Sequence, residues 1–324
     1  MKVCAACHTD LPKDNYSKKQ WKLDECQRRC KVCIADNREV QPIPKQDDDE
    51  SNTGDITKTL DSMYLENVGK SSDEELFKQR PSQYGDCPVC FLRLPTLNSG
   101  WRYMSCCGKE ICSGCFYAQV YDNQGNIVEK RVCPFCRIPT PTSEKEAIKR
   151  EKKRVDLGDA HAIYNHGVYY RDGENRFSID HTEALELWHR AGELGCAAAY
   201  LNIGYAYKRG KGVEVDETKA TYYYELAAMQ GDAHARYNLG NNEAFAGNID
   251  RGLKHHMIAA RDGYSDSLEM IKQMYSKGFA TKEDYTKALQ SYQAYLDEIK
   301  SRQRDEAAAT NANYPMEYAN CRYY

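Results

Sequence analysis

The chain has 324 residues, of which 41% are hydrophobic and 29% charged, and its formal net charge is −3 at pH 7. This length allows two or three domains. No stretch approaches the 18 or more apolar residues of a membrane span, and the N-terminus lacks the apolar segment of a secretory signal. An acidic balance argues against nucleic acid as a general partner. We expect an intracellular protein, cytoplasmic or nuclear, with no membrane partner.

Fifteen cysteines set the redox and metal expectations. Twelve of them fall into two clusters with C-x-x-C spacing, which leaves Cys26, Cys196 and Cys321. An odd total without a signal peptide argues against a disulfide framework, and C-x-x-C pairs supply two thiolates each to tetrahedral zinc. The sequence therefore predicts three bound zinc ions.

The first cluster lies in residues 1–40 and predicts one four-cysteine zinc site, formed by Cys4, Cys7, Cys30 and Cys33. The string L-P…Y-S-K-K-Q-W…R-R-C-x-x-C resembles the LIM-like finger of a heterochromatin adaptor, which implies a protein-interaction module. The finger also carries the basic patch of the chain. Its cations either offset the thiolate charge or contact an acidic partner or nucleic-acid backbone. They are Lys18, Lys19, Lys22, Arg28, Arg29 and Lys31.

Residues 41–82 are polar and acidic, with the stretches D-D-D-E-S-N-T-G and K-S-S-D-E-E. Such a composition has little apolar surface to bury. We expect a disordered linker, with a short helix near residues 74–79.

The second cluster, in residues 83–141, reads C-P-V-C, C-C-G-K-E-I-C-S-G-C and C-P-F-C-R. Its order and gaps resemble a RING finger. That resemblance implies two interleaved zinc sites, the first from Cys87, Cys90, Cys112 and Cys115 and the second from Cys106, Cys107, Cys133 and Cys136. Lys109 stands where a RING usually has a histidine ligand. The cluster is similar to the all-cysteine RING of the Not-complex ubiquitin ligase subunit.

The RING resemblance also implies a partner, a ubiquitin-conjugating enzyme. Such a finger contributes by positioning this enzyme and its ubiquitin, without chemical steps of its own. The resemblance implies contacts from Val89, from Pro134 and from Arg137, whose planar guanidinium can donate to two acceptors at once. The alternative is that Val89 and Pro134 only pack the knuckles and that Arg137 is a solvated charge.

Helical spacing begins near residue 143, and the sequence then repeats itself. Gly167, Gly204 and Gly240 are 37 and 36 residues apart, a period typical of stacked helix pairs. Y-K-R-G-K-G-V-E-V-D-E-T-K-A followed by A-A-M-Q-G resembles a Sel-1-like, TPR-like repeat. The expected divisions are a capping helix at 142–158, repeats at 159–195, 196–231 and 232–263, a degenerate capping repeat at 264–300 and a tail at 301–324.

Two residue types refine the helical half. Gly195, Gly231 and Gly263 fit the end of each second helix, where a left-handed residue is favoured. His255 and His256 have no cysteine or carboxylate at ligand spacing, so we expect surface or packing roles for them.

The sequence predicts a multidomain protein, with a zinc-stapled N-terminal finger and a RING-like α+β finger followed by an all-α solenoid of helix-pair repeats. We expect a ubiquitin ligase whose repeats bind a protein client. The sequence leaves open whether the chain is an enzyme; an enzyme with this sequence would be a RING-type ubiquitin-protein transferase. The alternative is a non-catalytic zinc-finger and solenoid adaptor for complex assembly, associated with chromatin. Lys109 favours the adaptor, whereas Arg137 favours the ligase.

Overall fold

The structure is a computed structural model that describes residues 2–3, 10–11, 56–67, 72–96, 100–118, 132–175 and 177–313. Contacts divide the chain into two units, residues 1–53 with 156–158 and residues 54–155 with 159–324. In the first unit, β1 (Lys2–Val3) pairs antiparallel with β2 (Asp10–Leu11). The other elements lie in the second unit.

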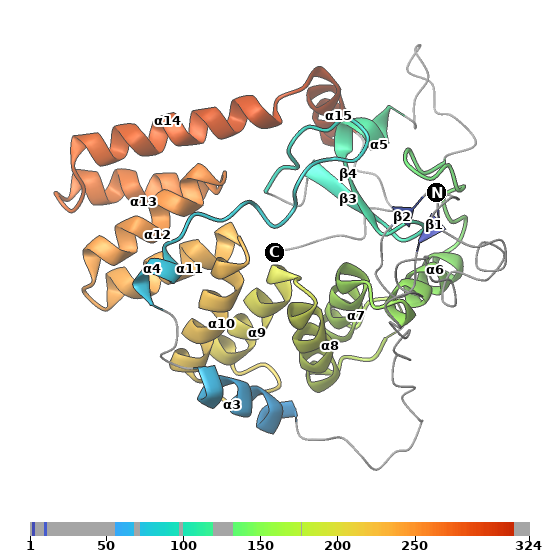
Figure 1. The fold of residues 1–324 in the computed structure, drawn as a ribbon, viewed down its shortest axis with the longest axis horizontal. Coiled ribbons are helices and arrows are strands. Elements are labelled where there is room, and N and C mark those ends of the chain that lie inside the picture. Colours follow the sequence, from blue (N-terminus) through green and yellow to red (C-terminus); the bar gives the residue numbers. More distant parts are fainter. Residues whose placement is uncertain are drawn as a thin grey trace. The chain divides into compact units, whose positions relative to one another are not determined.

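Most of the second unit consists of helices that pack in chain order (Figure 1). Each of three consecutive pairs packs internally, and the second helix of one pair packs on the first of the next. This arrangement confirms the predicted helix-pair array. The helices are α6 (Glu144–Asp156), α7 (Ala160–Asp172), α8 (His181–Glu193), α9 (Ala197–Arg209), α10 (Glu217–Met229), α11 (Ala233–Phe245), α12 (Ile249–Arg261), α13 (Ser265–Ser276), α14 (Lys282–Ile299) and α15 (Arg302–Asn313).

Repeated caps set the ends of these helices. Asp159, Asp180, Asp216 and Asp232 precede α7, α8, α10 and α11, and each carboxylate accepts from main-chain N–H groups of the first turn. The predicted glycines follow α8, α10 and α12 with φ between 91° and 94°. The N–H of the residue after each of these glycines bonds back to a carbonyl of the last turn, for example Cys196 N–H to Ala191 O at 2.9 Å.

Close approach within each pair depends on a second glycine. A Cβ added to Gly167 would lie 2.5 Å from the Trp188 ring, and one added to Gly204 would lie 2.5 Å from the Tyr224 ring. Gly240 meets His256 in the same way, at 2.7 Å. Each first helix therefore seats an aromatic or imidazole ring of its second helix against bare backbone.

The cysteine-rich module, residues 83–141 of which 83–96, 100–118 and 132–141 are described, is small and mixed in structure. Strand β3 (Trp101–Met104) pairs antiparallel with β4 (Lys109–Cys112), in a register that places Trp101 opposite Cys112. Helix α5 (Ser113–Tyr117) follows directly. Leu94, Trp101 and Ile111 form a small core together with the buried cysteines.

Part of the predicted disordered linker is helical, which corrects that expectation for residues 56–67. Helix α3 (Ile56–Asn67) places Ile56 and Leu60, which are 7% and 0% exposed, in the main core cluster of the repeats. Helix α4 (Asp73–Leu76) overlaps the short helix expected near residues 74–79. The apolar residues of α3 are few, but they recur at helical spacing and pack on the core of the repeats.

The C-terminal segment also differs from expectation, because α15 occupies residues 302–313 of the predicted tail. Helix α15 packs against α5 of the cysteine-rich module. Across the residues that the structure describes, no helix combines the length and apolar character needed to cross a bilayer.

Candidate metal centre

The two C-x-x-C knuckles of the module have the same backbone geometry. In the first, Phe91 N–H donates to Cys87 O at 2.8 Å and Cys87 N–H donates to Leu92 O at 2.9 Å. In the second, Arg137 N–H donates to Cys133 O at 3.0 Å and Cys133 N–H to Ile138 O at 2.8 Å. The residue after each knuckle is left-handed, with φ of 59° at Phe91 and 63° at Arg137. Two copies of one turn thus present two pairs of thiols.

The structure brings eight cysteines together in two groups of four. One contains Cys87, Cys90, Cys112 and Cys115, and the other contains Cys106, Cys107, Cys133 and Cys136. Within each group, all Sγ atoms lie within 4.8 Å of one another. These groups are the interleaved sets that the RING resemblance implies.

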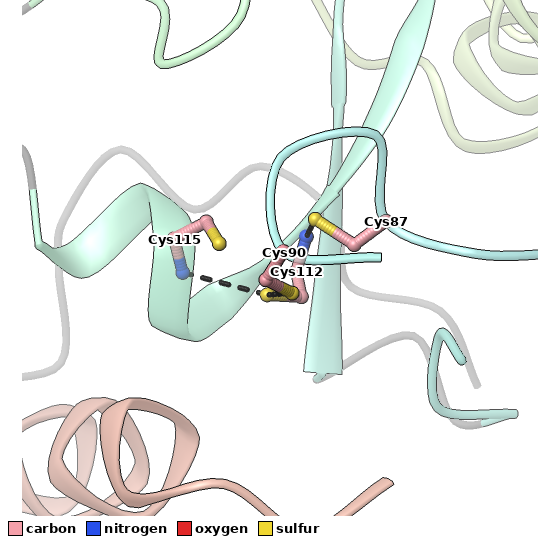
Figure 2. Close-up of side chains that lie close together, drawn as sticks. All are labelled: Cys87, Cys90, Cys112 and Cys115. Carbon is pink, nitrogen blue, oxygen red and sulfur yellow. Dashed lines mark hydrogen bonds between the residues drawn. The ribbon is translucent and has the colours of Figure 1, made fainter. Parts of the chain in front are cut away.

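Figure 2 shows how the first group converges from three elements. Cys87 and Cys90 come from the first knuckle, Cys112 ends β4 and Cys115 lies in α5. Cys112 N–H points at Cys87 Sγ and Cys115 N–H at Cys112 Sγ, both at 3.4 Å. Main-chain donors of this kind stabilise negative charge on thiolate sulfur.

The sulfur spacing fits zinc. The Sγ–Sγ distances are 3.7 Å between Cys90 and Cys112, 3.8 Å between Cys107 and Cys133, and 3.4 Å between Cys106 and Cys136. Tetrahedral Zn–S bonds of about 2.3 Å place sulfurs about 3.8 Å apart. An all-thiolate donor set without carboxylates is the chemistry of a structural zinc site rather than of magnesium or calcium.

Without metal these thiols titrate unequally. The hydrogen bond with Cys112 lowers the pKa of Cys87, and the same bond raises the pKa of Cys112. Burial raises the pKa of Cys115 to about 12 and that of Cys133 to about 11. A metal bound here would have to displace protons from the buried thiols.

Lys109, which replaces the usual RING histidine, begins β4 and is in neither cysteine group. The adjacent Cys106 and Cys107 both reach the second group. This arrangement agrees with an all-cysteine second site.

The two knuckles also carry exposed apolar side chains. Val89 and Phe91 of the first knuckle are 37% and 78% exposed, and Phe135 and Ile138 of the second are 43% and 42% exposed. Arg137 is exposed too. Pro134 is buried, so it suits the predicted partner contact less well than its neighbour Phe135 does. The family pattern indicates the proline inside C-P-F-C, whereas the exposure of Phe135 is visible only in the structure.

Another side of the module is occupied by the helical array. The Glu110 carboxylate lies 3.0 Å from His161 Nδ1, and the Tyr103 ring stacks on the His161 ring. Gly108 leaves no room for a Cβ beside the side chains of Arg154 and Asp159. The β3–β4 hairpin therefore packs on the start of α7, which sequence reasoning did not predict.

The remaining predicted ligands, Cys4, Cys7, Cys30 and Cys33, lie outside the described residues, as do Cys26 and Cys321. The third zinc ion therefore stays a prediction. Cys196, which follows α8, is half-buried, and burial raises the pKa of its thiol to about 12. This protonated thiol belongs to neither cysteine group.

Comparison with known proteins identifies the first two helix pairs and a segment within α13 and α14. The model of the Sel1 repeat matches residues 160–196, 197–232 and 273–293, so the chain carries Sel1 repeats. A Sel1 repeat protein from Oxalobacter formigenes is 30% identical, with a TM-score of 0.40 over 48% of this chain and 63% of that one.

Two curated relatives have names from the ubiquitin pathway. The E3 ubiquitin-protein ligase DA2 of Arabidopsis thaliana is 30% identical over 28% of this chain and 21% of its own length. The ERAD-associated E3 ubiquitin-protein ligase component HRD3A of the same plant is 37% identical over 28% of this chain and 12% of its own length. The matches therefore span at most about a fifth of either relative.

Proposed function

We propose that this chain is a zinc-stabilised ubiquitin ligase of the RING type. In this proposal the cysteine-rich module recruits a ubiquitin-conjugating enzyme and the Sel1 repeats hold a protein client. The observation that carries it is the pair of matched knuckles. Each knuckle supplies two thiols to a four-thiol group and carries exposed apolar side chains. The names of the two relatives support the same pathway.

The residues have separate roles in this proposal. Zinc, held by the two groups, would fix distant stretches of chain together where the small apolar core alone is marginal. Val89, Phe91 and Phe135 offer desolvatable surface to the conjugating enzyme. Arg137 is exposed and lies in a left-handed turn immediately after the second knuckle. Its planar fork can hydrogen-bond the enzyme and its ubiquitin together. The contribution to rate is one of positioning.

The test is self-ubiquitylation with a panel of ubiquitin-conjugating enzymes. Val89→Ala and Arg137→Ala should each reduce the ladder at least about tenfold, a loss of ~1.4 kcal/mol in transition-state stabilisation. Matched controls are Val215→Ala, 64% exposed before α10, and Arg302→Ala, whose side chain is 92% exposed on α15. Both controls should retain the ladder.

The packing of the β3–β4 hairpin against α7 favours a second candidate, an adaptor in which the module is a zinc-stapled spacer. Folded, zinc-loaded protein that forms no ladder with any enzyme of the panel would contradict the ligase and favour this adaptor. Equal ladders from Val89→Ala and Val215→Ala would instead reject the assigned contact surface.

A further inference from the structure

The C-terminal helix reaches into the first knuckle through one side chain. Arg304, 7% exposed, donates from Nη1 to Arg93 O at 2.7 Å and from Nη2 to Leu92 O at 3.2 Å. Nη2 also lies 4.0 Å from Cys90 Sγ. Nη1 further donates to Ile299 O at 2.8 Å, at the end of α14. One guanidinium thus joins the knuckle to the junction of α14 and α15.

The backbone of α15 is equally close to the other half of the same cysteine group. A Cβ on Gly114, beside Cys115 in α5, would lie 2.8 Å from Arg304 N and 2.9 Å from the main-chain carbon of Gln303. Ala307, one turn further along α15, is 1% exposed. Glycine at position 114 is therefore what allows α15 to pack directly on α5.

The loop after the first knuckle has a second attachment to the C-terminal helices. The guanidinium of Arg93 bridges Glu298 at 2.8 Å and Asp262 at 3.5 Å. Thr96 N–H donates to Tyr295 Oη at 2.8 Å. Residues 92–96 are thus fixed by groups about 200 positions later in the chain, which the knuckle sequence gives no reason to expect.

We propose that Arg304 is a positioning residue of the first cysteine group, so that this metal site is completed by the C-terminal helix rather than by the module alone. The inference rests on the proposed zinc binding. Four thiolates around one Zn²⁺ leave a net charge of about −2, which a guanidinium beside Cys90 offsets. The same guanidinium holds the carbonyls that follow Cys90, and so the direction of its sulfur.

Arg304 contacts the module at the first knuckle and at Gly114 of α5, which both belong to the first cysteine group, so the two sites should respond differently to its loss. Groups that support metal ligands typically contribute about 10- to 100-fold to metal retention. Arg304→Ala should therefore release zinc from the first group faster by about this factor and leave the second group unchanged. The second group is an internal control for folding.

The experiment uses the full zinc-loaded chain mixed with a chelator and a thiol-alkylating reagent, with alkylated cysteines identified over time by peptide mass spectrometry. In Arg304→Ala, modification of the first group (Cys87, Cys90, Cys112 and Cys115) should precede that of the second group (Cys106, Cys107, Cys133 and Cys136). Gly114→Ala, which pushes α15 away without removing the arginine, should act in the same direction. Arg302→Ala, on the exposed face of α15, is the matched control.

Unchanged modification of the first group in both Arg304→Ala and Gly114→Ala, relative to Arg302→Ala, would overturn the proposal. Equal acceleration at both groups would also overturn it, because it would indicate general unfolding of the module. A wild-type chain that retains no zinc would remove the premise as well. Zinc retention that depends on Arg304, in a chain that forms no ubiquitin ladder, would reject the ligase and leave this inference standing.

Discussion

His255 and His256 of α12 are the clearest case of a buried titratable pair in the repeats. Both are 0% exposed. Burial lowers the pKa of His255 to about 3, with the nearby Arg236 as a further cause, and burial lowers the pKa of His256 to about 4. Both imidazoles are therefore neutral in the folded chain at any pH near neutrality.

This pair predicts acid-sensitive stability. Unfolded histidine has a pKa of about 6.5. Below that pH the unfolded chain therefore binds protons at these two histidines that the folded chain does not bind. The free energy of unfolding should fall as pH falls from about 6.5 towards about 4, by ~1.4 kcal/mol per pH unit for each histidine. Urea unfolding at pH 7.5, 6.5, 5.5 and 5.0 measures this slope.

The control is His256→Gln, compared with wild type at each pH so that any loss of metal affects both proteins. Burial lowers the pKa of His189 and His234 as well, so the variant should lose one histidine's share of the slope, ~1.4 kcal/mol per pH unit, whatever its stability at pH 7.5. An unaltered slope would show that His256 does not carry the predicted proton linkage.

The role of His256 shows what the sequence could have predicted at this scale. Packing was one of two expected roles, and the structure confirms it. His256 faces Gly240 as Trp188 faces Gly167 and Tyr224 faces Gly204. The spacing of the glycines is visible in the sequence. The residue that faces each glycine differs in type from pair to pair, so its position becomes clear only when the helix pairs are aligned in the structure.

Among the elements, α3 depends most on tertiary packing. It has 12 residues, a length at which isolated helices are marginal in water. Its Leu60 and Met63 carbonyl oxygens accept hydrogen bonds from the hydroxyls of Tyr223 and Tyr222 of α10, at 3.2 and 3.3 Å. Helix α3 is thus held by both apolar side chains and its own backbone.

Leu60→Asp should detach α3 and lower the free energy of unfolding by at least about 3 kcal/mol, because it leaves an uncompensated charge in a buried site. Leu65→Asp, on the same helix at 71% exposure, should change stability by less than about 0.5 kcal/mol. Denaturant unfolding gives both values. Amide hydrogen exchange of residues 56–67 shows whether α3 itself is lost. Equal effects of the two substitutions would contradict the packing role of Leu60.

The sequence and the structure differ at α3 for a physical reason. Ile56, Leu60 and Tyr64 are spaced for a helix, but they are isolated within a polar, acidic stretch whose composition favours disorder. The surface that receives them is made by α8 and α10, more than 120 residues later in the chain. The Sel1 repeats were predictable because the same residue pattern recurs along the chain, whereas the pattern of α3 occurs once.

Over the whole second unit, the cysteine-rich module links distant parts of the helical array. It contacts His161 of α7 through Glu110 and Tyr103, and Tyr295 and Glu298 of α14 through Thr96 and Arg93. The resemblance to a RING implied both four-thiol groups, because that family's order of cysteine pairs specifies which pairs share a site. These docking contacts are single residues without a spacing pattern, so the sequence did not indicate them.

Removal of the metal should therefore destabilise helices that hold no cysteine ligand. If chelation disorders the module, α7 and α14 lose the groups that bridge them, and the helical signal should melt at a lower temperature. A loss of 1 kcal/mol corresponds to about 2–4 °C for a unit of this size. Thermal unfolding followed by far-ultraviolet circular dichroism, with and without chelator, measures the shift.

Tyr295→Phe tests whether this coupling runs through the docking contacts. The substitution removes the hydroxyl that accepts the Thr96 N–H bond, so the chelation shift should become smaller because part of the link is already absent. Tyr292→Phe, a nearby change on α14, should leave the shift as in wild type. Helices that melt at the same temperature with and without chelator would show that the array stands without the module. Docking would then orient the cysteine-rich module without stabilising the repeats.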